Sequence, residues 1–491
     1  MLLLGLCRLF LGEKSKNNWS VSDIGSNRME AEFIYRYRSI ENILKWRELE
    51  DHYIYFSRVS DLNDPLEGAK YLYWKGDAIV WKNLLRHYLH CTLRALLLAL
   101  CDNEFDKESC RSFAREIPGD VCSPGYQEVY NKCCKLFFEN SAVHNLVDCL
   151  SLNGRVVFAY ELLLYLRTLH SGLVLKCLYS ALCDQGIFLF NDPKFLDNVV
   201  DSQEAHLLRF ISAPYQDNDV AEAIFAATCH VMDSLTFGRT HNNLCNTRKE
   251  ILFIIESFPS YYVDALNDLI YPNFHVACFS DDPTNASMWS VYGDRHRGVC
   301  LKFKTTIDSE NNKSIRLLTE YGINDRGKLY KEMHHTLNEI KYDAGFEKID
   351  FFQSIGTIPL QKINRFWYTS IDDKISTIAS SREDSNAWRE NYWNTFSRIY
   401  STKLPDWQHE KECRLVLNSL MNDYVASDSR KLKYNINDLD GIIFGINASN
   451  ESKASIYDLV KDNFSDKLDL KFYQAHYSRW QKKIVLLPLR A

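Results

Sequence analysis

The sequence lacks the features that would place the chain in a membrane or an oxidising compartment. No stretch approaches about 18 consecutive apolar residues, so no transmembrane helix and no membrane partner are predicted. The 15 cysteines form no Cys-x-x-Cys pair, and their scattered positions suit neither a zinc knuckle nor a disulfide scaffold. We therefore expect reduced thiols, a cytoplasmic location and no bound metal.

Common catalytic signatures are also missing. The sequence contains no glycine-rich phosphate loop, no His-Glu-x-x-His zinc helix and no Gly-x-Ser-x-Gly elbow. A net charge of −6 provides no overall positive field for nucleic acid, which leaves only a local basic groove open. Any chemistry must therefore come from a less familiar arrangement of side chains.

The composition is that of an ordered globular protein large enough for several lobes. The 491 residues are 46% hydrophobic and 25% charged. Residues 1–28 are expected to be a disordered or loosely ordered tail. Residues 29–70 and 272–491 are expected to form the two parts of an α+β core. Residues 71–271 show apolar residues near a 3.6-residue period, which predicts a helical insertion lobe.

Local patterns within the core predict its elements. Aromatic and β-branched runs predict strands, and apolar residues at helical spacing predict helices. The predicted strands cover 33–38, 52–57, 275–280, 298–303, 316–321, 413–417, 441–444 and 484–487, and the predicted helices cover 40–49, 287–292, 328–401 and 456–463.

Three distant segments place ionisable and aromatic groups beside predicted strands. They are "IYFSRVSDLNDPLEG" at 54–68, "HVACFSDDPTNASMWSVYGDRHRGVCLKF" at 275–303 and "WQHEKECRLVL" at 407–417. These segments can share one pocket only if the fold brings them together. That convergence is the main structural hypothesis from the sequence.

The last segment carries two glutamates two residues apart. Residues two apart share a face of a strand, so Glu410, Glu412 and Arg414 point the same way if the strand begins that early. Two carboxylates so close raise the pKa of one of them unless a cation intervenes, which is the environment of an acid/base pair. A solvated edge-strand face with Arg414 as ion-pair partner explains the same pattern, and both interpretations stay open.

The first strand carries two arginines. Strand parity places Arg36 and Arg38 on one face, where either can make bidentate bonds to a phosphate. The alternative is that one of them pairs with Asp64 or Glu67 in the Asn-Asp-Pro turn. That turn is interpreted as structural, because its asparagine or aspartate side chain can cap it and its proline restricts it. A direct catalytic role for Asp64 or Glu67 is the alternative.

The middle segment offers aromatic rings. Trp289 and Tyr292 are three residues apart on a predicted helix, so they share a face and can stack a planar ligand ring. Core packing is the alternative for Trp289. His296 in the following loop is interpreted as a hydrogen-bonding structural residue. Ser57 and Ser280 end two strands and can line the mouth of a pocket.

The segments resemble the bacterial domain-of-unknown-function family two-nine-seven-one. That family shows a "KYR" strand, an "FNDPFE" turn, a "CFS…MWxxYAxxHxGxCIEF" block and a "WxxExEyR" strand. The corresponding stretches here are "YRYRS", "YFSRVSDLNDPLEG", "CFS…MWSVYGDRHRGVCLKF" and "WQHEKECRLVL", with "LDGIIFGINAS" as a weaker match to the closing strand. Leu66 stands where the family has an aromatic residue.

A more distant resemblance is to ADP-ribosyltransferase folds. The order of a strand with Tyr and Arg, a helix, a strand ending in Ser and a late Glu-x-Glu strand is similar to theirs. The resemblance implies an α+β fold with a mixed or antiparallel sheet and NAD as co-substrate. It implies that Glu412 is catalytic, stabilising an oxocarbenium-like transition state, and that Glu410 assists it.

The same resemblance implies a cofactor-binding set. Arg36 or Arg38 would hold the diphosphate, and Trp289 or Tyr292 the base. Tyr37, Ser57 and Ser280 complete the set. The setting would be a bacterial conflict system, such as phage defence or a toxin, with an unidentified protein or nucleic-acid acceptor.

Two other functions stay open. The first is a non-catalytic sensor or interaction module that binds a protein partner through the helical lobe at 71–271. The second is a nucleic-acid-processing enzyme, against which the acidic balance and the missing cluster of metal ligands argue.

Overall fold

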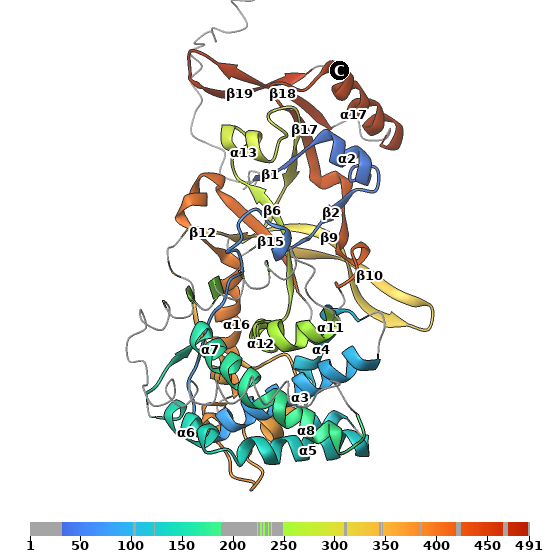
Figure 1. Cartoon of the computed structure of the whole chain (residues 1–491). Helices are drawn as coiled ribbons and strands as arrows, with labels where there is room; N and C mark the ends of the chain where they lie inside the picture. Colours follow the sequence, from blue (N-terminus) through green and yellow to red (C-terminus); the bar gives the residue numbers. More distant parts are fainter. Residues whose placement is uncertain are drawn as a thin grey trace, which may run out of the picture.

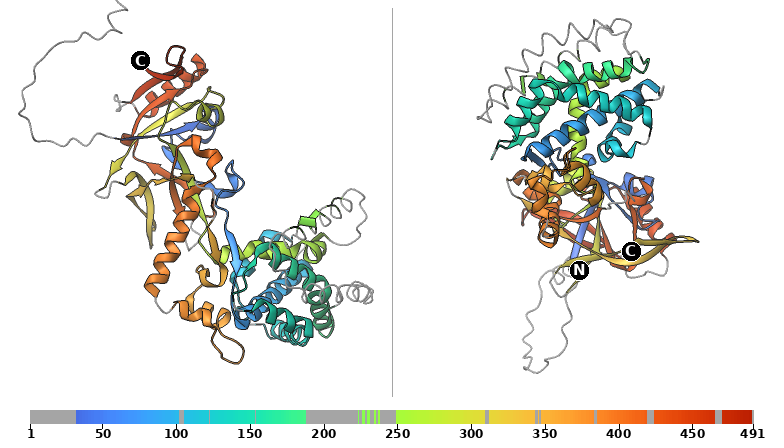
Figure 2. Two further views of the ribbon diagram at one scale, coloured as in Figure 1. Left: turned by 90° about the vertical axis from the view of Figure 1, so that its left-hand side faces the viewer. Right: turned by 90° about the horizontal axis from the view of Figure 1, so that it is seen from below.

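The computed structural model describes residues 32–187 and 249–489, except 102–104, 122, 153, 309–311, 343–344, 346, 383–384, 419–423 and 465–469, together with single positions between 223 and 237. The expected tail at 1–28 and most of 188–248 lie outside the described residues. Figure 1 shows a sheet-containing part above a helical lobe, and Figure 2 shows the same two parts from the side and from below.

The core contains a nine-stranded sheet. Its order is β11-β15-β6-β1-β7-β17-β18-β19, with β3 pairing β6, and every pair is antiparallel except β17 with β18. The strands are β1 (Phe33–Arg38), β3 (Ser57–Arg58), β6 (Phe274–Ser280), β7 (Val299–Lys304), β11 (Asn338–Glu339), β15 (Glu412–Asn418), β17 (Leu439–Phe444), β18 (Lys471–Ser478) and β19 (Lys483–Leu489).

Local chemistry explains how the chain enters this sheet. Ser39 follows β1 and accepts a hydrogen bond from the Asn42 backbone N–H, so it caps α2 (Ile40–Trp46). Arg47 ends that helix in the left-handed conformation, and the chain returns as β2 (Tyr53–Tyr55). The predicted opening of strand, helix and strand is therefore confirmed.

A five-stranded sheet packs beside the first. Its order is β10-β9-β16-β2, with β8 pairing β9. The remaining strands are β8 (Thr306–Ile307), β9 (Lys313–Asn324), β10 (Gly327–Thr336) and β16 (Lys431–Tyr434). Ile34 and Leu415 of the first sheet share an apolar cluster with Leu317 and Leu432 of the second, and Ile456 of α17 (Asn450–Asn463) joins it. The predicted α+β class is thus confirmed.

The prediction of helix throughout 328–401 is wrong at its start. β9 and β10 form a long hairpin, and short strands β12 (Lys341–Tyr342) and β13 (Lys348–Asp350) follow. The turn signal was overlooked: the Asn324 side chain accepts from the Arg326 N–H, and Gly327 has a φ of +117°. Helix begins only with α14 (Phe351–Ser354), α15 (Leu360–Lys362) and α16 (Ser385–Ser401).

The helical lobe is built around α3 (Ala78–Cys101). Helices α5 (Pro124–Phe138), α6 (Ser141–Leu150) and α12 (Phe258–Ala265) contact α3 directly, while α8 (Leu175–Cys183) packs on α5 and α7 (Ala159–Leu169) packs on α12. Phe351, Trp367 and Phe396, from the segment expected in the second part of the core, join the same apolar cluster. β13 also pairs with β4 (Tyr71–Trp74), which in turn pairs with β5 (Val157–Phe158).

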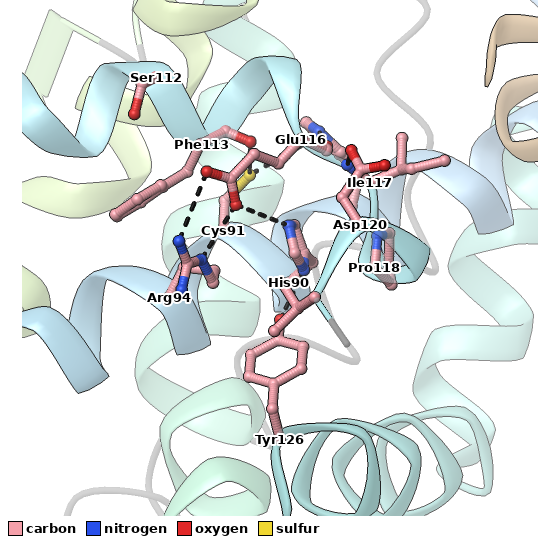
Figure 3. A network of polar contacts seen from close by, with 12 residues as sticks. His90, Cys91, Arg94, Ser112, Phe113, Glu116, Ile117, Pro118, Asp120 and Tyr126 are labelled. Carbon is pink, nitrogen blue, oxygen red and sulfur yellow. Dashed lines mark hydrogen bonds and ion pairs between the residues drawn. The ribbon is translucent and has the colours of Figure 1, made fainter. Parts of the chain in front are cut away.

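Helix α3 is long and apolar enough to cross a membrane by length and composition alone, and 67% of its most apolar window is buried inside the protein. It also carries buried polar groups. The Tyr126 hydroxyl lies 2.5 Å from His90 Nδ1, and the Glu116 carboxylate lies 3.0 Å from Arg94 Nε and 3.9 Å from His90 Nε2, as Figure 3 shows. Burial lowers the pKa of His90 to about 2, so this histidine is neutral in the folded lobe.

Candidate active site

A cavity of about 240 Å³ opens where the three motif segments meet. Its wall is formed by β1, the chain after β3, β6, α13 (Ala286–Val291), β14 (Thr402–Lys403) and the start of β15. The lining residues are Tyr35, Arg36, Tyr37, Arg38, Ser57, Asp61, Leu62, Asn63, Glu67, Val276, Cys278, Phe279, Met288, Tyr292, Lys403, Glu410 and Glu412. The predicted convergence of distant segments is therefore present.

One buried lysine joins three carboxylates in the cavity wall. Lys403 Nζ lies 2.6 Å from Glu410 Oε2, 3.2 Å from Glu412 Oε2 and 3.6 Å from Glu67 Oε2. All four side chains are at most 4% exposed. The ring of Trp407 covers the ammonium at 4.7 Å. Buried charges persist only when they are paired, and here the pairing links the turn segment to the late segment.

Arg414 is the second cation of this cluster. Its Nε lies 2.6 Å from Glu412 Oε1, its Nη2 lies 2.9 Å from Glu412 Oε2, and it also contacts Glu67. Burial works against ionisation of Glu412, but Arg414 and Lys403 outweigh it and hold the pKa of this carboxyl well below its usual range. Burial raises the pKa of Glu67 despite the same two cations.

These contacts exclude the alternative of a solvated edge strand. β15 lies between β11 and β6, and Glu412 and Arg414 are buried. Arg414 does form an ion pair with Glu412, as that alternative assumed, but the pair lies in the protein interior. Glu410 is not on the strand: it ends the 3₁₀ turn Pro405–Glu410, and Lys411 is left-handed. Both glutamates nevertheless reach Lys403, so the like charges are separated by a cation.

The two glutamates differ in how many acceptor positions remain. Glu412 accepts three hydrogen bonds from Arg414 and Lys403, and the Cys278 thiol also bonds it. Glu410 accepts one from the Tyr292 hydroxyl at 2.7 Å and one from Lys403. Because a carboxylate offers about four acceptor positions, Glu410 retains more capacity toward the cavity.

The two arginines of β1 also differ. Arg38 is paired with Glu48, whose Oε2 lies 2.8 Å from Arg38 Nε, so the alternative pairing with Asp64 or Glu67 does not hold for Arg38. Arg36 donates from Nη2 to the Tyr55 carbonyl at 2.9 Å, while its buried Nη1 has no partner. The residue is 8% exposed, and burial lowers its pKa to about 10. An unpaired guanidinium in a cavity wall is suited to an anion.

The remaining predicted residues divide between the cavity and its support. Ser57 and Tyr37 line the cavity, and the Tyr37 hydroxyl donates to the Asp282 carbonyl at 2.6 Å. Trp289 does not line it: its ring is fully buried, edge-on to Tyr37, and its Nε1 donates to the Pro283 carbonyl. Ser280 is also fully buried and donates to the Glu410 carbonyl at 2.9 Å.

Two residues outside the lining set have structural contacts. His296 donates its backbone N–H to Trp289 and accepts from the Asn447 N–H, which ties the loop after α13 to the one after β17. Asp64 accepts the Leu66 N–H at 2.9 Å and so caps its own turn. The Asp64 contact agrees with the structural interpretation of the turn. The His296 contacts are made by its backbone, and its buried imidazole Nδ1 has no partner among the described residues, so they do not test the interpretation of its side chain.

Sequence reasoning missed Lys403 entirely and gave Glu67 a minor place. Lys403 follows α16 in a two-residue strand, β14, with no pattern that distinguishes it from a surface lysine. The only signal was indirect, since two nearby carboxylates either have a cation between them or raise the pKa of one of them. Within the described part of the chain, no group of three or more His, Cys, Asp or Glu side chains has the arrangement of a metal site.

Comparison with known proteins identifies a family over part of the chain. Residues 288–415 match the model of a family described as Protein of unknown function (DUF2971). The resemblance drawn from the motifs is confirmed for these residues, which include Tyr292, Lys403 and both glutamates. No curated protein matches the chain, and no solved structure does.

Proposed function

We propose that the protein is an NAD-using enzyme that transfers ADP-ribose to an acceptor or cleaves NAD with water. The proposal is carried by one observation: Glu410 and the unpaired Arg36 line the same cavity. A carboxylate suits a sugar carbon on which positive charge develops, and a guanidinium suits the adjoining diphosphate. The distant resemblance to ADP-ribosyltransferases supports the same reaction.

The reaction would break the bond between the ribose anomeric carbon and the nicotinamide nitrogen. Nicotinamide leaves with the bonding electron pair, and the ribose carbon becomes oxocarbenium-like. An acceptor nucleophile or water then forms the new bond and loses its proton to solvent or to a cavity carboxylate. Preorganised negative charge beside that carbon stabilises the transition state without reorganisation.

The contacts distribute the roles among the residues. Glu410 has free acceptor positions for a ribose hydroxyl, so we propose it as the substrate-facing carboxylate. Glu412, which accepts hydrogen bonds from both Arg414 and Lys403, holds Lys403 in place beside Glu410. Arg36 is the diphosphate ligand, because Arg38 is held by Glu48. Of the two rings predicted to stack the base, Tyr292 lines the cavity and is assigned that role, since Trp289 is buried outside the lining.

The size of the cavity limits which part of NAD it takes. A volume of about 240 Å³ lies below the roughly 300–1,000 Å³ of pockets that enclose a drug-sized ligand. We therefore propose that the nicotinamide riboside end enters and that the adenosine lies outside. A bacterial defence or toxin setting fits an enzyme that consumes NAD or modifies a target, and it rests on the family resemblance.

The test is incubation of the purified chain with NAD labelled in the nicotinamide ring. Release of free nicotinamide is expected, and it should fall at least a hundredfold in Glu410→Gln, while Glu347→Gln, at a half-exposed ion pair with Arg398, changes nothing. Glu412→Gln should also lose activity. No release by the wild-type chain, with or without candidate acceptors from a host lysate, would count against the enzyme.

A non-catalytic sensor is the second candidate. It is favoured because Lys403 and Arg414 neutralise the cavity carboxylates. Burying such ion pairs costs free energy, but it gives a fixed cavity wall that is suited to holding a ligand of one shape. Binding of ADP-ribose by calorimetry without nicotinamide release, together with a protein partner retained through residues 71–271, would support this alternative.

A further inference from the structure

The tip of the β18–β19 hairpin is the most exposed aromatic feature in the described part of the chain. Trp480 in the turn is 94% exposed, whereas Trp74, Trp81, Trp289 and Trp367 are fully buried. Tyr477, at the end of β18, is 57% exposed. Large aromatic side chains left in water usually mark a contact surface.

The same tip gathers positive charge. Arg479, Lys482 and Lys483 are exposed around Trp480, within the run "SRWQKK". Among the ion pairs formed by described residues, none includes these three cations. A chain with a net charge of −6 thus presents three unpaired cations and a tryptophan on one short turn. Such a local concentration is complementary to a polyanion.

The tip is held by well-packed strands. β18 and β19 pair up to Ser478 and Lys483, and the Gln481 N–H donates to Ser478 Oγ within the turn. Ala475 and Ile484 below it are buried in the cluster that contains Tyr37 and Trp289. The hairpin therefore rests on the elements that shape the cavity, at the end of the molecule away from the helical lobe in Figure 1.

We propose that this tip, made of Tyr477, Arg479, Trp480, Lys482 and Lys483, binds single-stranded nucleic acid. An aromatic ring stacks on a base of any sequence, and flanking cations follow the phosphate backbone. An anionic membrane is the other polyanion with this chemistry. It is disfavoured because insertion needs several apolar side chains at one depth, and the exposed Leu487 and Leu489 lie toward the far end of β19.

The test measures binding of labelled single-stranded DNA and RNA oligonucleotides by fluorescence anisotropy, without NAD. Trp480→Ala should weaken binding about fivefold or more, and the triple variant Arg479→Gln, Lys482→Gln, Lys483→Gln should reduce the salt slope by about 2. The matched controls are Trp46→Ala, a half-exposed tryptophan on α2, and Lys453→Gln with Lys461→Gln on α17. Both controls should bind as the wild type does.

Three results would overturn the proposal. The first is that the wild-type chain binds no oligonucleotide, and the second is that the wild type and Trp480→Ala bind equally well. The third is that the chain binds phosphatidylserine vesicles but not oligonucleotides. Because the turn is exposed, the variants should keep the wild-type circular dichroism spectrum. Oligonucleotide binding is measured without NAD, so a failure to bind does not count against the proposed NAD reaction. In the same way, a failure to release nicotinamide does not count against oligonucleotide binding.

Discussion

Lys403 Nζ lies 2.6 Å from Glu410 Oε2, and both side chains are buried in the cavity wall. This pair joins a short strand after α16 to the 3₁₀ turn before β15. Because Lys403 also reaches Glu67 and Glu412, it ties two of the three motif segments electrostatically, as does Arg414, which contacts the same two glutamates. The consequences of this arrangement can be measured.

Replacing Lys403 with methionine should destabilise the protein by about 3–5 kcal/mol, because three buried carboxylates would then share one guanidinium. Urea unfolding followed by circular dichroism measures the change. Lys328→Met, at an exposed pair with Glu320, is the control and should cost less than about 1 kcal/mol. Adding Glu410→Gln to Lys403→Met should restore part of the loss. A loss below that of the control would show that the cluster contributes nothing to stability.

Trp289 should behave as a core residue rather than as a ligand-stacking ring. Trp289→Ala should cost about 3–5 kcal/mol of unfolding free energy, because the fully buried indole leaves a cavity beside Tyr37. Tyr292→Phe keeps the ring and removes only the hydroxyl bonded to Glu410, so about 1.5–3 kcal/mol is expected. Thermal or urea unfolding distinguishes the two variants. A smaller loss of unfolding free energy for Trp289→Ala than for Tyr292→Phe would contradict the assignment of Trp289 as the core residue.

Acid should destabilise the helical lobe through His170. Burial lowers the pKa of His170 to about 4, below the value of about 6.5 in the unfolded chain. The unfolded state therefore binds more protons between these pH values. The contribution of His170 is complete above about pH 6.5 and falls by roughly 3 kcal/mol as the pH drops to 4.

Unfolding free energy measured against pH tests this linkage. His170→Gln should reduce the slope of the curve between pH 6.5 and 4, even though it loses hydrogen bonds to Tyr88 and the Ile254 carbonyl. Part of the slope should remain, because burial also lowers the pKa of His87 and His90. His144→Gln, at an exposed position of α6, is the control for replacing a histidine of the same lobe. An unaltered slope in His170→Gln would contradict the prediction.

The two β1 arginines should differ in ligand binding. If the cavity takes the diphosphate of ADP-ribose, Arg36→Met should weaken its binding at least tenfold by calorimetry, since this guanidinium has an unpartnered nitrogen. Arg38→Met should instead lower stability, because it leaves buried Glu48 unpaired. Equal losses of affinity in both variants would contradict the assignment of the phosphate contact to Arg36.

Local patterns in the sequence were sufficient for the elements that frame the cavity. Aromatic and β-branched residues marked β1, β6 and β15, and Ser39 and the Asn-Asp-Pro turn marked where the chain reverses. Seven of the nine predicted site residues line one cavity. The sequence could predict these residues because strand periodicity and turn chemistry depend on neighbours in the chain. The hairpin of β9 and β10 was missed because its turn signal was overlooked within an otherwise polar run.

The sequence by itself determined which segments carry the ionisable groups, and that Glu410 and Glu412 on one face need either an intervening cation or a raised pKa on one carboxyl. Only the tertiary structure decided that this cation is Lys403, that Arg38 is taken by Glu48, and that Trp289 is enclosed. The physical reason is that these partners are set by strand register and by the packing of distant elements. Pairing of Glu412 with Ser280 across β15 and β6 is one example, and nothing in the residues adjacent to either position specifies it.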